Sequence, residues 1–495
     1  MSDRNQHDAD HLETLDRDLH RLSYLEGATQ YAARPMVGPG IALAFMVIAG
    51  FAAAIFFGHE PSSYVVVLAA VFGAYMALNI GANDVANNMG PAVGANALTL
   101  GGAIAIAAIF ESAGALLAGG DVVSTISKDI IAPSAMASTD VFIWAMMSAL
   151  ISAALWVNLA TWIGAPVSTT HSVVGGVLGA GIAAAGFAAV SWPTMSAIAA
   201  SWVISPVLGG VIAAAFLALI KSRVIYQDDK IEAAKKWVPI LVGIMVAAFA
   251  AYLALKGLKR VMTIDLPTAV AIGAALGVVA WLVTVPLIRK QAVGLENRNK
   301  SLKVPFGIPL VISAALLSFA HGANDVANAV GPLAAIVHAA EFGSFSSEVA
   351  IPMWVMVIGA FGISFGLFLF GPKLIRMVGG QITKLNPMRA YCVSLSAAIT
   401  VIVASWLGLP VSSTHIAVGA VFGVGFFREW DTSRRMRTLS QTLPEERRIA
   451  TEERRRRKLV RRSHFMTIVA AWVITVPAAA LLSGIIFIIL SAIVS

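Results

Sequence analysis

The chain alternates long apolar segments with short polar ones along almost its whole length. The apolar segments lie near residues 41–57, 64–80, 98–119, 143–163, 167–186, 197–220, 238–256, 267–288, 305–320, 351–371, 391–408, 411–427 and 465–490. A helix of about 20 such residues crosses the roughly 30 Å hydrocarbon core of a bilayer. The strict residue-by-residue alternation that is typical of membrane β-barrels is absent. The pattern therefore predicts an all-α polytopic membrane protein with about 12 transmembrane helices.

Polar residues enter this apolar background mainly in two motifs, and each motif occurs twice. The string GANDVAN occupies residues 81–87 and returns at 322–328, and PVSTTH at 166–171 returns as PVSSTH at 410–415. Asp84 precedes Ser168 by 84 residues, and Asp325 precedes Ser412 by 87. Because both motifs recur in the same order at nearly the same distance, the chain contains an internal repeat.

Basic residues around the two halves predict their orientation. The lead-in to the first half, 58–63, has no Lys or Arg, whereas the lead-in to the second, 289–303, has five. The stretch 186–195 is uncharged but its counterpart 428–463 is basic, and five basic residues follow the first half at 221–236. Basic loops face the cytoplasm. We therefore expect two inverted-topology repeats, with broken or re-entrant helices at the midplane and a cytosolic N-terminus.

These patterns divide the chain into five regions. We expect a cytosolic N-terminal tail at 1–40, an extra transmembrane helix at 41–57, transmembrane repeat 1 at 60–225, linking helices with basic cytosolic loops at 226–303, and transmembrane repeat 2 at 304–495, which contains a basic cytosolic insert at 428–463. The insert is interpreted as a solvated topology determinant, with anionic-lipid binding as the alternative. The loop at 256–260 runs against the charge rule, because its three basic residues fall on the predicted outer side.

Composition excludes several classes of function. With 58% hydrophobic and 13% charged residues, and a mean hydropathy of +0.80, the chain cannot be a soluble protein. The net charge of +8 is accounted for by cytoplasmic loops, so no nucleic-acid partner is expected. The single cysteine, Cys392, rules out an intrachain disulfide. There is no phosphate-binding loop for ATP, which disfavours a primary pump, and we expect no cofactor.

The second motif suits the binding of an anion. Pro166 and Pro410 are placed to end one segment, because the residue before a proline disfavours helix. Ser168 and Ser412 then fit as helix N-caps. Half-helix N-termini offer N–H groups and a positive dipole end to an anion. The motif therefore predicts two clusters of neutral donors, made of Ser168, Thr169 and Thr170 and of Ser412, Ser413 and Thr414.

The acids inside apolar segments point to a second, positively charged ligand. Charge is costly there, so Asp84, Asp325 and Glu111 are candidate functional residues. An aspartate beside an anion needs a cation or a proton. Carboxylate and carboxamide oxygens suit a hard cation, so we assign cation or proton coupling to Asp84, Asp325, Asn83, Asn324 and Glu111, with sodium at the two aspartates. Interhelical hydrogen bonding is the alternative role for the asparagines.

Two polar residues break the similarity of the halves. Alignment of the glycines that follow places Ile363 opposite Glu111, so the second half has no matching acid. His321 stands directly before the second GANDVAN string, where the first half has Ile80. Any role for His321 is therefore asymmetric.

Both copies of both motifs resemble the signatures of the inorganic phosphate transporter (PiT) family, from about residue 60 to the end of the chain. The resemblance implies a secondary active transporter that imports inorganic phosphate by alternating access, driven by a sodium or proton gradient. The implied phosphate-binding residues are Ser168, Thr169, Thr170, Ser412, Ser413, Thr414, Asn87 and Asn328. The N-terminal tail, the first helix and the 428–463 insert lie outside the shared signature.

The same motifs allow two rival interpretations. Sulfate or another tetrahedral oxyanion is the alternative substrate. Phosphate, unlike sulfate, can be protonated near neutral pH and donate a hydrogen bond to Asp84 or Asp325. An intramembrane hydrolase using Ser168 and His171 is disfavoured, because an inverted duplication serves a carrier, and we expect no enzymatic activity.

The expected partners are inorganic phosphate, Na+ or H+, and membrane lipid, and the sequence leaves the formation of a homodimer open. We expect a multi-pass protein of the cell membrane, placed in the inner membrane if the chain is bacterial, with its N-terminus in the cytosol.

Overall fold

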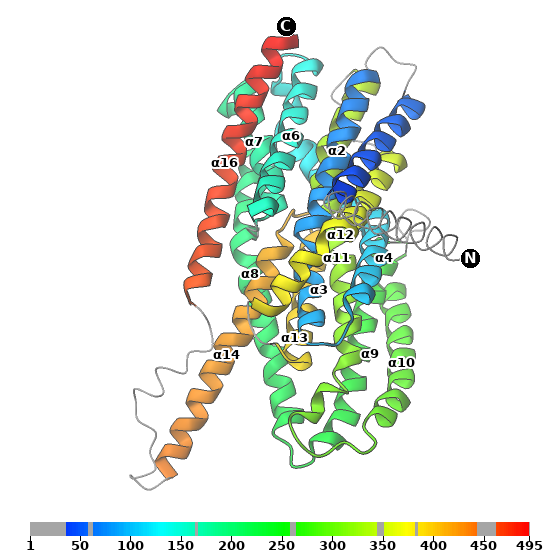
Figure 1. Ribbon diagram of the computed structural model, residues 1–495, viewed down its shortest axis with the longest axis vertical. Coiled ribbons are helices and arrows are strands. Elements are labelled where there is room, and N and C mark those ends of the chain that lie inside the picture. Colours follow the sequence, from blue (N-terminus) through cyan, green and yellow to red (C-terminus); the bar gives the residue numbers. More distant parts are fainter. Residues whose placement is uncertain are drawn as a thin grey trace, which may run out of the picture.

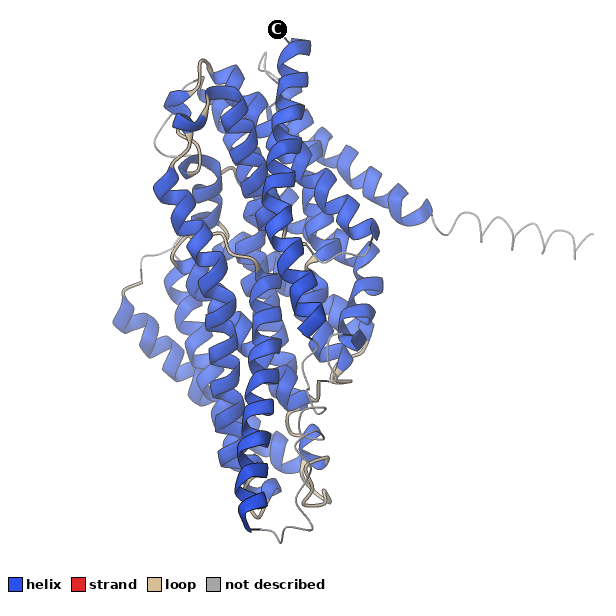
Figure 2. Cartoon of the chain, turned by 90° about the vertical axis from the view of Figure 1, so that its left-hand side faces the viewer, coloured by secondary structure: helices blue, strands red, loops and turns tan. Residues whose placement is uncertain are grey.

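The computed structural model describes residues 36–57, 63–163, 167–257, 264–343, 351–381, 385–442 and 462–494. Within these ranges the chain is almost entirely helical, and the β-type pairing consists of one isolated bridge between Ile131 and Val190. Figure 2 shows the helices running side by side along the long axis of the molecule. The expectation of an all-α protein is confirmed.

The helices follow the predicted apolar segments closely. After a first helix at Met36–Phe57 come α2 (Ser63–Asn83), α3 (Val85–Gly94), α4 (Leu100–Ala118), α5 (Gly120–Ser124), the π-helical turn η1 (Thr125–Asp129), α6 (Thr139–Ile163), α7 (Thr169–Ala185), α8 (Trp192–Ile220), α9 (Lys230–Lys256), α10 (Leu266–Gln291), α11 (Gly307–Phe342), α12 (Met353–Gln381), α13 (Pro387–Trp406), α14 (Ser413–Thr442) and α16 (Arg462–Val494). Eleven helical stretches of the described chain are long and apolar enough to cross a membrane, and α7 is a shorter apolar helix.

Helices of each half pack against helices of the other half, in a reciprocal pattern. The helices that carry the GANDVAN motif, α2 and α11, pack against α12 and α4 of the opposite half. The helices that begin at the second motif, α7 and α14, pack against α16 and α8, again of the opposite half (Figure 1). Each half thus completes the other. Their opposite orientation in the membrane stays a prediction.

Glycines permit the close approach of these exchanged helices. A Cβ atom on Gly81 would overlap the carbonyl oxygen of Ile363, and one on Gly322 would overlap that of Glu111. Both contacts involve backbone, so a side chain fits at neither glycine without moving a helix. The two contacts are equivalent in the repeat and agree with the alignment of Glu111 with Ile363.

Segments outside the repeats are attached in specific ways. The linking helices α9 and α10 pack mainly against each other (Figure 1). α14 continues beyond its apolar part, and its Asp431 forms an ion pair of 2.6 Å with Lys221, the residue directly after α8. Lys256 forms an ion pair with Asp121, which neutralises one of the basic residues on the predicted outer side.

Parts of four predicted regions lie outside the described residues. These are 1–35 of the N-terminal tail, 60–62 and 164–166 of repeat 1, 258–263 of the loop after α9, and 344–350, 382–384, 443–461 and 495 of repeat 2, where 443–461 belongs to the basic insert. Pro166 therefore lies outside the described residues.

Candidate functional site

The two GANDVAN motifs differ slightly in their backbone. In the first half one residue, Asp84, separates α2 from α3, although its backbone angles stay in the helical region. In the second half α11 continues as a helix through Asp325 and beyond. The sequence predicted helix breaks at Pro166 and Pro410 and none at the GANDVAN motifs, and the second of these motifs lies within an uninterrupted helix.

The second motif forms the predicted helix caps in both halves. α7 begins at Thr169, and the Ser168 hydroxyl accepts a hydrogen bond from the His171 N–H at 3.1 Å. α14 begins at Ser413, and Ser412 accepts from the His415 N–H at 3.2 Å. Both serines are N-caps, as the prolines and spacing indicated.

The carboxylate of Asp84 joins the starts of both capped helices. Its Oδ2 atom accepts a hydrogen bond of 2.7 Å from the hydroxyl of Thr169. Its Oδ1 atom accepts one of 3.0 Å from the hydroxyl of Thr414, which belongs to the other half. The Asn87 carboxamide in turn donates to Thr414 Oγ1 at 2.9 Å. One aspartate thereby connects residues from both repeats.

The second half contributes a matching set of contacts. Asp325 Oδ2 accepts a hydrogen bond from the Ser413 hydroxyl at 2.9 Å. Asn328 Nδ2 lies 3.2 Å from the hydroxyls of both Thr169 and Thr170, which belong to the first half. All four motifs therefore meet at one place, although they are separated by up to 330 residues in the chain.

Asn83 and Asn324 link the motifs to neighbouring helices. Asn83 donates a hydrogen bond of 2.8 Å to the Thr161 hydroxyl near the end of α6. The Asn324 carboxamide contacts the Ser405 hydroxyl near the end of α13 at 3.1 Å. These two contacts are equivalent in the repeat, and they correspond to the interhelical role that the sequence left open for the asparagines.

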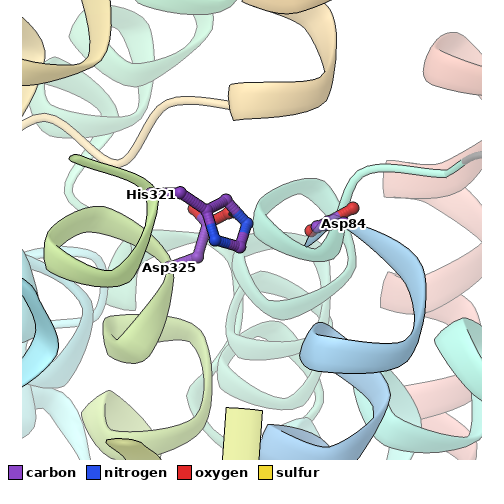
Figure 3. A group of neighbouring side chains, drawn as sticks. All are labelled: Asp84, His321 and Asp325. Atoms are coloured by element: carbon purple, nitrogen blue, oxygen red, sulfur yellow. Dashed lines mark ion pairs between the residues drawn. The ribbon is translucent and has the colours of Figure 1, made fainter. Parts of the chain in front are cut away.

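A buried polar chain extends the site on one side. His321 Nε2 lies 2.7 Å from Asp325 Oδ2, and His321 Nδ1 lies 3.3 Å from Glu111 Oε1. Asn88 donates a hydrogen bond of 3.0 Å to the same glutamate oxygen. Figure 3 shows His321 and Asp325 projecting from one helix and Asp84 from another.

Sequence reasoning assigned no role to Asn88 and only an undefined one to His321. A signal was nevertheless present. The counterparts of Asn88, His321 and Glu111 in the other half are Ala329, Ile80 and Ile363. These three polar residues, which lack a polar counterpart in the other half, form one connected set in which Glu111 contacts both Asn88 and His321.

The centre of the site is a candidate cation site. Asp84, His321 and Asp325 each offer a ligand atom, and these atoms lie within 4.8 Å of one another. The hydroxyls of Thr169 and Thr414 touch the same Asp84 carboxylate. The carboxylate and hydroxyl oxygens suit a hard cation such as sodium, whereas His321 offers a nitrogen atom.

The site is closed to solvent. None of the predicted site residues is more than 6% exposed, and Asp84, Asp325 and Glu111 are 2% exposed or less. A bound ion would be enclosed by protein, and a change of conformation is needed for it to enter or leave.

Comparison with known proteins places the chain among phosphate transporters. Residues 80–483 match the phosphate transporter family. A Helicobacter pylori (strain J99) protein classed by name among phosphate permeases is 51% identical over 415 residues, which are 83% of this chain and 78% of that protein. The Arabidopsis thaliana protein "Inorganic phosphate transporter 2-1, chloroplastic" is 37% identical, covering 83% of this chain and 70% of its own length.

A solved structure, named "The sodium-dependent phosphate transporter", has the same fold. It superposes with a TM-score of 0.78 at 35% sequence identity, and the match covers 87% of this chain and 100% of that one. Because the family match and the relatives extend over most of the sequence, the chain belongs to the phosphate transporter family.

Proposed function

We propose that this protein is a secondary active transporter that imports inorganic phosphate together with sodium, by alternating access. The observation that carries the proposal is the contact of Asp84 with Thr169 and Thr414, the first-turn hydroxyls of the two capped helices. A carboxylate held between two anion-binding helix ends is the arrangement expected when an anion and a cation bind together.

Phosphate would be held by neutral donors. The first N–H groups of a helix have no partners within the helix and attract anions. α7 and α14 both begin at the site, and their hydroxyls come from Thr169, Thr170, Ser413 and Thr414. None of the four motifs contains Lys or Arg, so the anion would be balanced by the co-transported cation rather than by a fixed positive charge.

Sodium would be held at Asp84 and Asp325, with Glu111 contributing through His321. The two aspartates, one from each GANDVAN motif, lie on the same cluster. Sodium between a carboxylate and phosphate lowers the electrostatic cost of both, because each ion is attracted to its neighbour of opposite charge. Binding of the two ions would therefore be coupled. The structural relative is named as a sodium-dependent transporter, which favours sodium over protons here.

Alternating access fits a closed site between two repeats that exchange helices. In repeat-built transporters, one part commonly moves against the other around a central site. The multi-pass helical chain would lie in the cell membrane with its N-terminus in the cytosol, as the basic loops indicate.

Ion replacement in proteoliposomes tests the proposal. External sodium is replaced by choline at constant pH, and uptake of labelled phosphate is measured. We expect uptake to stop. If uptake continues and follows an imposed pH gradient, protons drive transport and the sodium assignment is wrong.

Competition separates phosphate from sulfate. A tenfold excess of sulfate should leave labelled phosphate uptake nearly unchanged, whereas the same excess of unlabelled phosphate should suppress it. Equal suppression by both anions would contradict selectivity for phosphate.

A further inference from the structure

We propose that a polar cavity beside the site is the outer vestibule through which phosphate approaches. The cavity has a volume of about 460 Å³ and lies between η1, the beginning of α8 and the loop that precedes α14. Its polar wall consists of Thr125, Lys128, Asp129, Ser191 and Thr194. This inference rests on the proposed function, because it supplies the route to the site described above.

One loop runs from the vestibule to the site. Leu407, Gly408 and Leu409 line the cavity, and Ser412 and Ser413 follow within a few residues. On the vestibule side the Thr125 hydroxyl donates a hydrogen bond of 2.7 Å to the Gly408 carbonyl.

The end of the loop nearest the site is hydrogen-bonded to a site residue. Thr170 donates a hydrogen bond of 3.0 Å to the carbonyl of Val411, which lies directly before the Ser412 cap. A displacement of this loop would connect the vestibule to the helix start at Ser413.

The loop turns at a glycine just after α13. Gly408 adopts a left-handed conformation with φ of +69°. Only glycine adopts this conformation without appreciable steric cost. The residues opposite belong to a π-helical turn, Thr125–Asp129, and such turns occur frequently at functional sites.

The charges of the vestibule match the two ions that would be transported together. Lys128 is the basic residue among those that line the cavity, and Asp129 is the acidic one. The motifs themselves have no basic residue. Lys128 can therefore raise the local concentration of phosphate before it reaches neutral donors, while Asp129 does the same for a cation.

A second cavity gives a useful contrast. It is larger, about 920 Å³, and its lining includes Ala199, Val203, Val207, Val211 and Phe426. No Lys, Arg, Asp or Glu lines it. Its basic side chains are the imidazoles of His171 and His415, so it has no counterpart of Lys128, although it also borders α8.

The predicted orientation puts the polar cavity on the outer side. Ser191 and Thr194 belong to the uncharged stretch 186–195, for which the charge pattern predicts an extracellular location. An importer receives its substrate from the outer side of the membrane, so a cavity on that side can serve as its entrance.

Cysteine accessibility tests the vestibule without requiring transport. Ala197 lines the polar cavity and Ala199 the apolar one, and both are exposed residues of α8. Ala197→Cys and Ala199→Cys are therefore matched variants. The native Cys392 is fully buried, so it contributes little background. Intact cells are treated with membrane-impermeant thiosulfonates, one anionic and one cationic.

We expect both reagents to modify Ala197→Cys from outside, with phosphate slowing the reaction, and neither to modify Ala199→Cys. Adding Lys128→Gln should lower the ratio of the anionic to the cationic rate roughly threefold to tenfold, and adding Asp129→Asn should raise it. In uptake assays Lys128→Gln should raise the KM for phosphate by a similar factor without changing sodium activation, and Lys128→Arg should restore it.

Three results would overturn the inference. The first is that Ala197→Cys is not modified from outside, and the second is that it is modified only from the cytosolic side. The third is that the ratio of the anionic to the cationic modification rate does not change in Lys128→Gln. Failure of the proposed function would be seen differently. Uptake would be independent of sodium, while the rates of cysteine modification would stay as expected for the vestibule.

Discussion

Replacement of Thr414 by valine isolates the contact on which the proposed site depends. Valine has nearly the shape of threonine, so packing is retained while the hydroxyl is lost. Asp84 Oδ1 then loses a 3.0 Å hydrogen bond, and Asn87 loses the acceptor of its 2.9 Å bond. Both groups are buried, and Asp84 is only 2% exposed, so water cannot readily replace the hydroxyl.

The size of the effect follows from these two bonds. A hydrogen bond to a charged group contributes about 1.5–3 kcal/mol. Each 1.4 kcal/mol corresponds to a factor of about ten. Thr414→Val should therefore lower kcat/KM for phosphate uptake roughly tenfold to hundredfold, whereas Thr414→Ser should remain close to the unmodified protein.

The assay is initial-rate uptake in proteoliposomes, with thermal unfolding measured on the same preparations. Thr284→Val is the matched control, because Thr284 is 4% exposed and its hydroxyl donates to the Ala280 carbonyl within α10, away from the site. The control should transport normally. Uptake by Thr414→Val within about twofold of the unmodified protein would refute the role given to the hydroxyl, as would an equal loss in the control.

Three further substitutions have distinct expected outcomes. Gly322→Ala should reduce uptake by about a hundredfold, because the new Cβ would displace the Glu111 backbone and shift site residues on both helices; Gly101→Ala, which meets nothing within 4 Å, should not. Glu111→Gln should alter sodium activation more than phosphate KM, as measured by uptake at varied sodium, and the reverse pattern would remove Glu111 from the coupling role. Asp431→Asn breaks the partly exposed ion pair with Lys221 and should lower the free energy of unfolding by about 1 kcal/mol with unchanged KM.

The sequence was a good guide wherever local patterns determine structure. Apolar length predicts the spanning helices, and a serine after Pro-Val predicts the helix caps at Ser168 and Ser412. The same reasoning identified Asp84 and Asp325, because carboxylates are rare in apolar segments. These features depend on a few neighbouring residues and on the cost of exposing polar groups to lipid.

Contacts between distant helices could not be obtained in this way. The pairing of Glu111 with His321 depends on how α4 approaches α11, which is allowed by the missing side chain at Gly322. The sequence also offers no reason why the helix is irregular at Asp84 while α11 is regular through Asp325. Asn83 and Asn324 were assigned to the cation, but their contacts with Thr161 and Ser405 depend on the ends of α6 and α13.

Mismatches between the halves were the strongest unused signal. A duplicated chain conserves its shared machinery, so polar residues present in only one copy should be compared with one another. Asn88, Glu111 and His321 form one such set, and they are in contact. They make the two half-sites chemically unequal, although the motifs are nearly identical.

Phosphate binding to the purified protein at varied sodium tests the central proposal most directly. If Asp84 holds a sodium ion beside phosphate, sodium should tighten phosphate binding by about tenfold or more, and phosphate should tighten sodium binding by the same factor, as linkage requires. Asp84→Asn should abolish this coupling in both directions. Phosphate affinity that is independent of sodium, or coupling that survives Asp84→Asn, would contradict a shared site for the two ions.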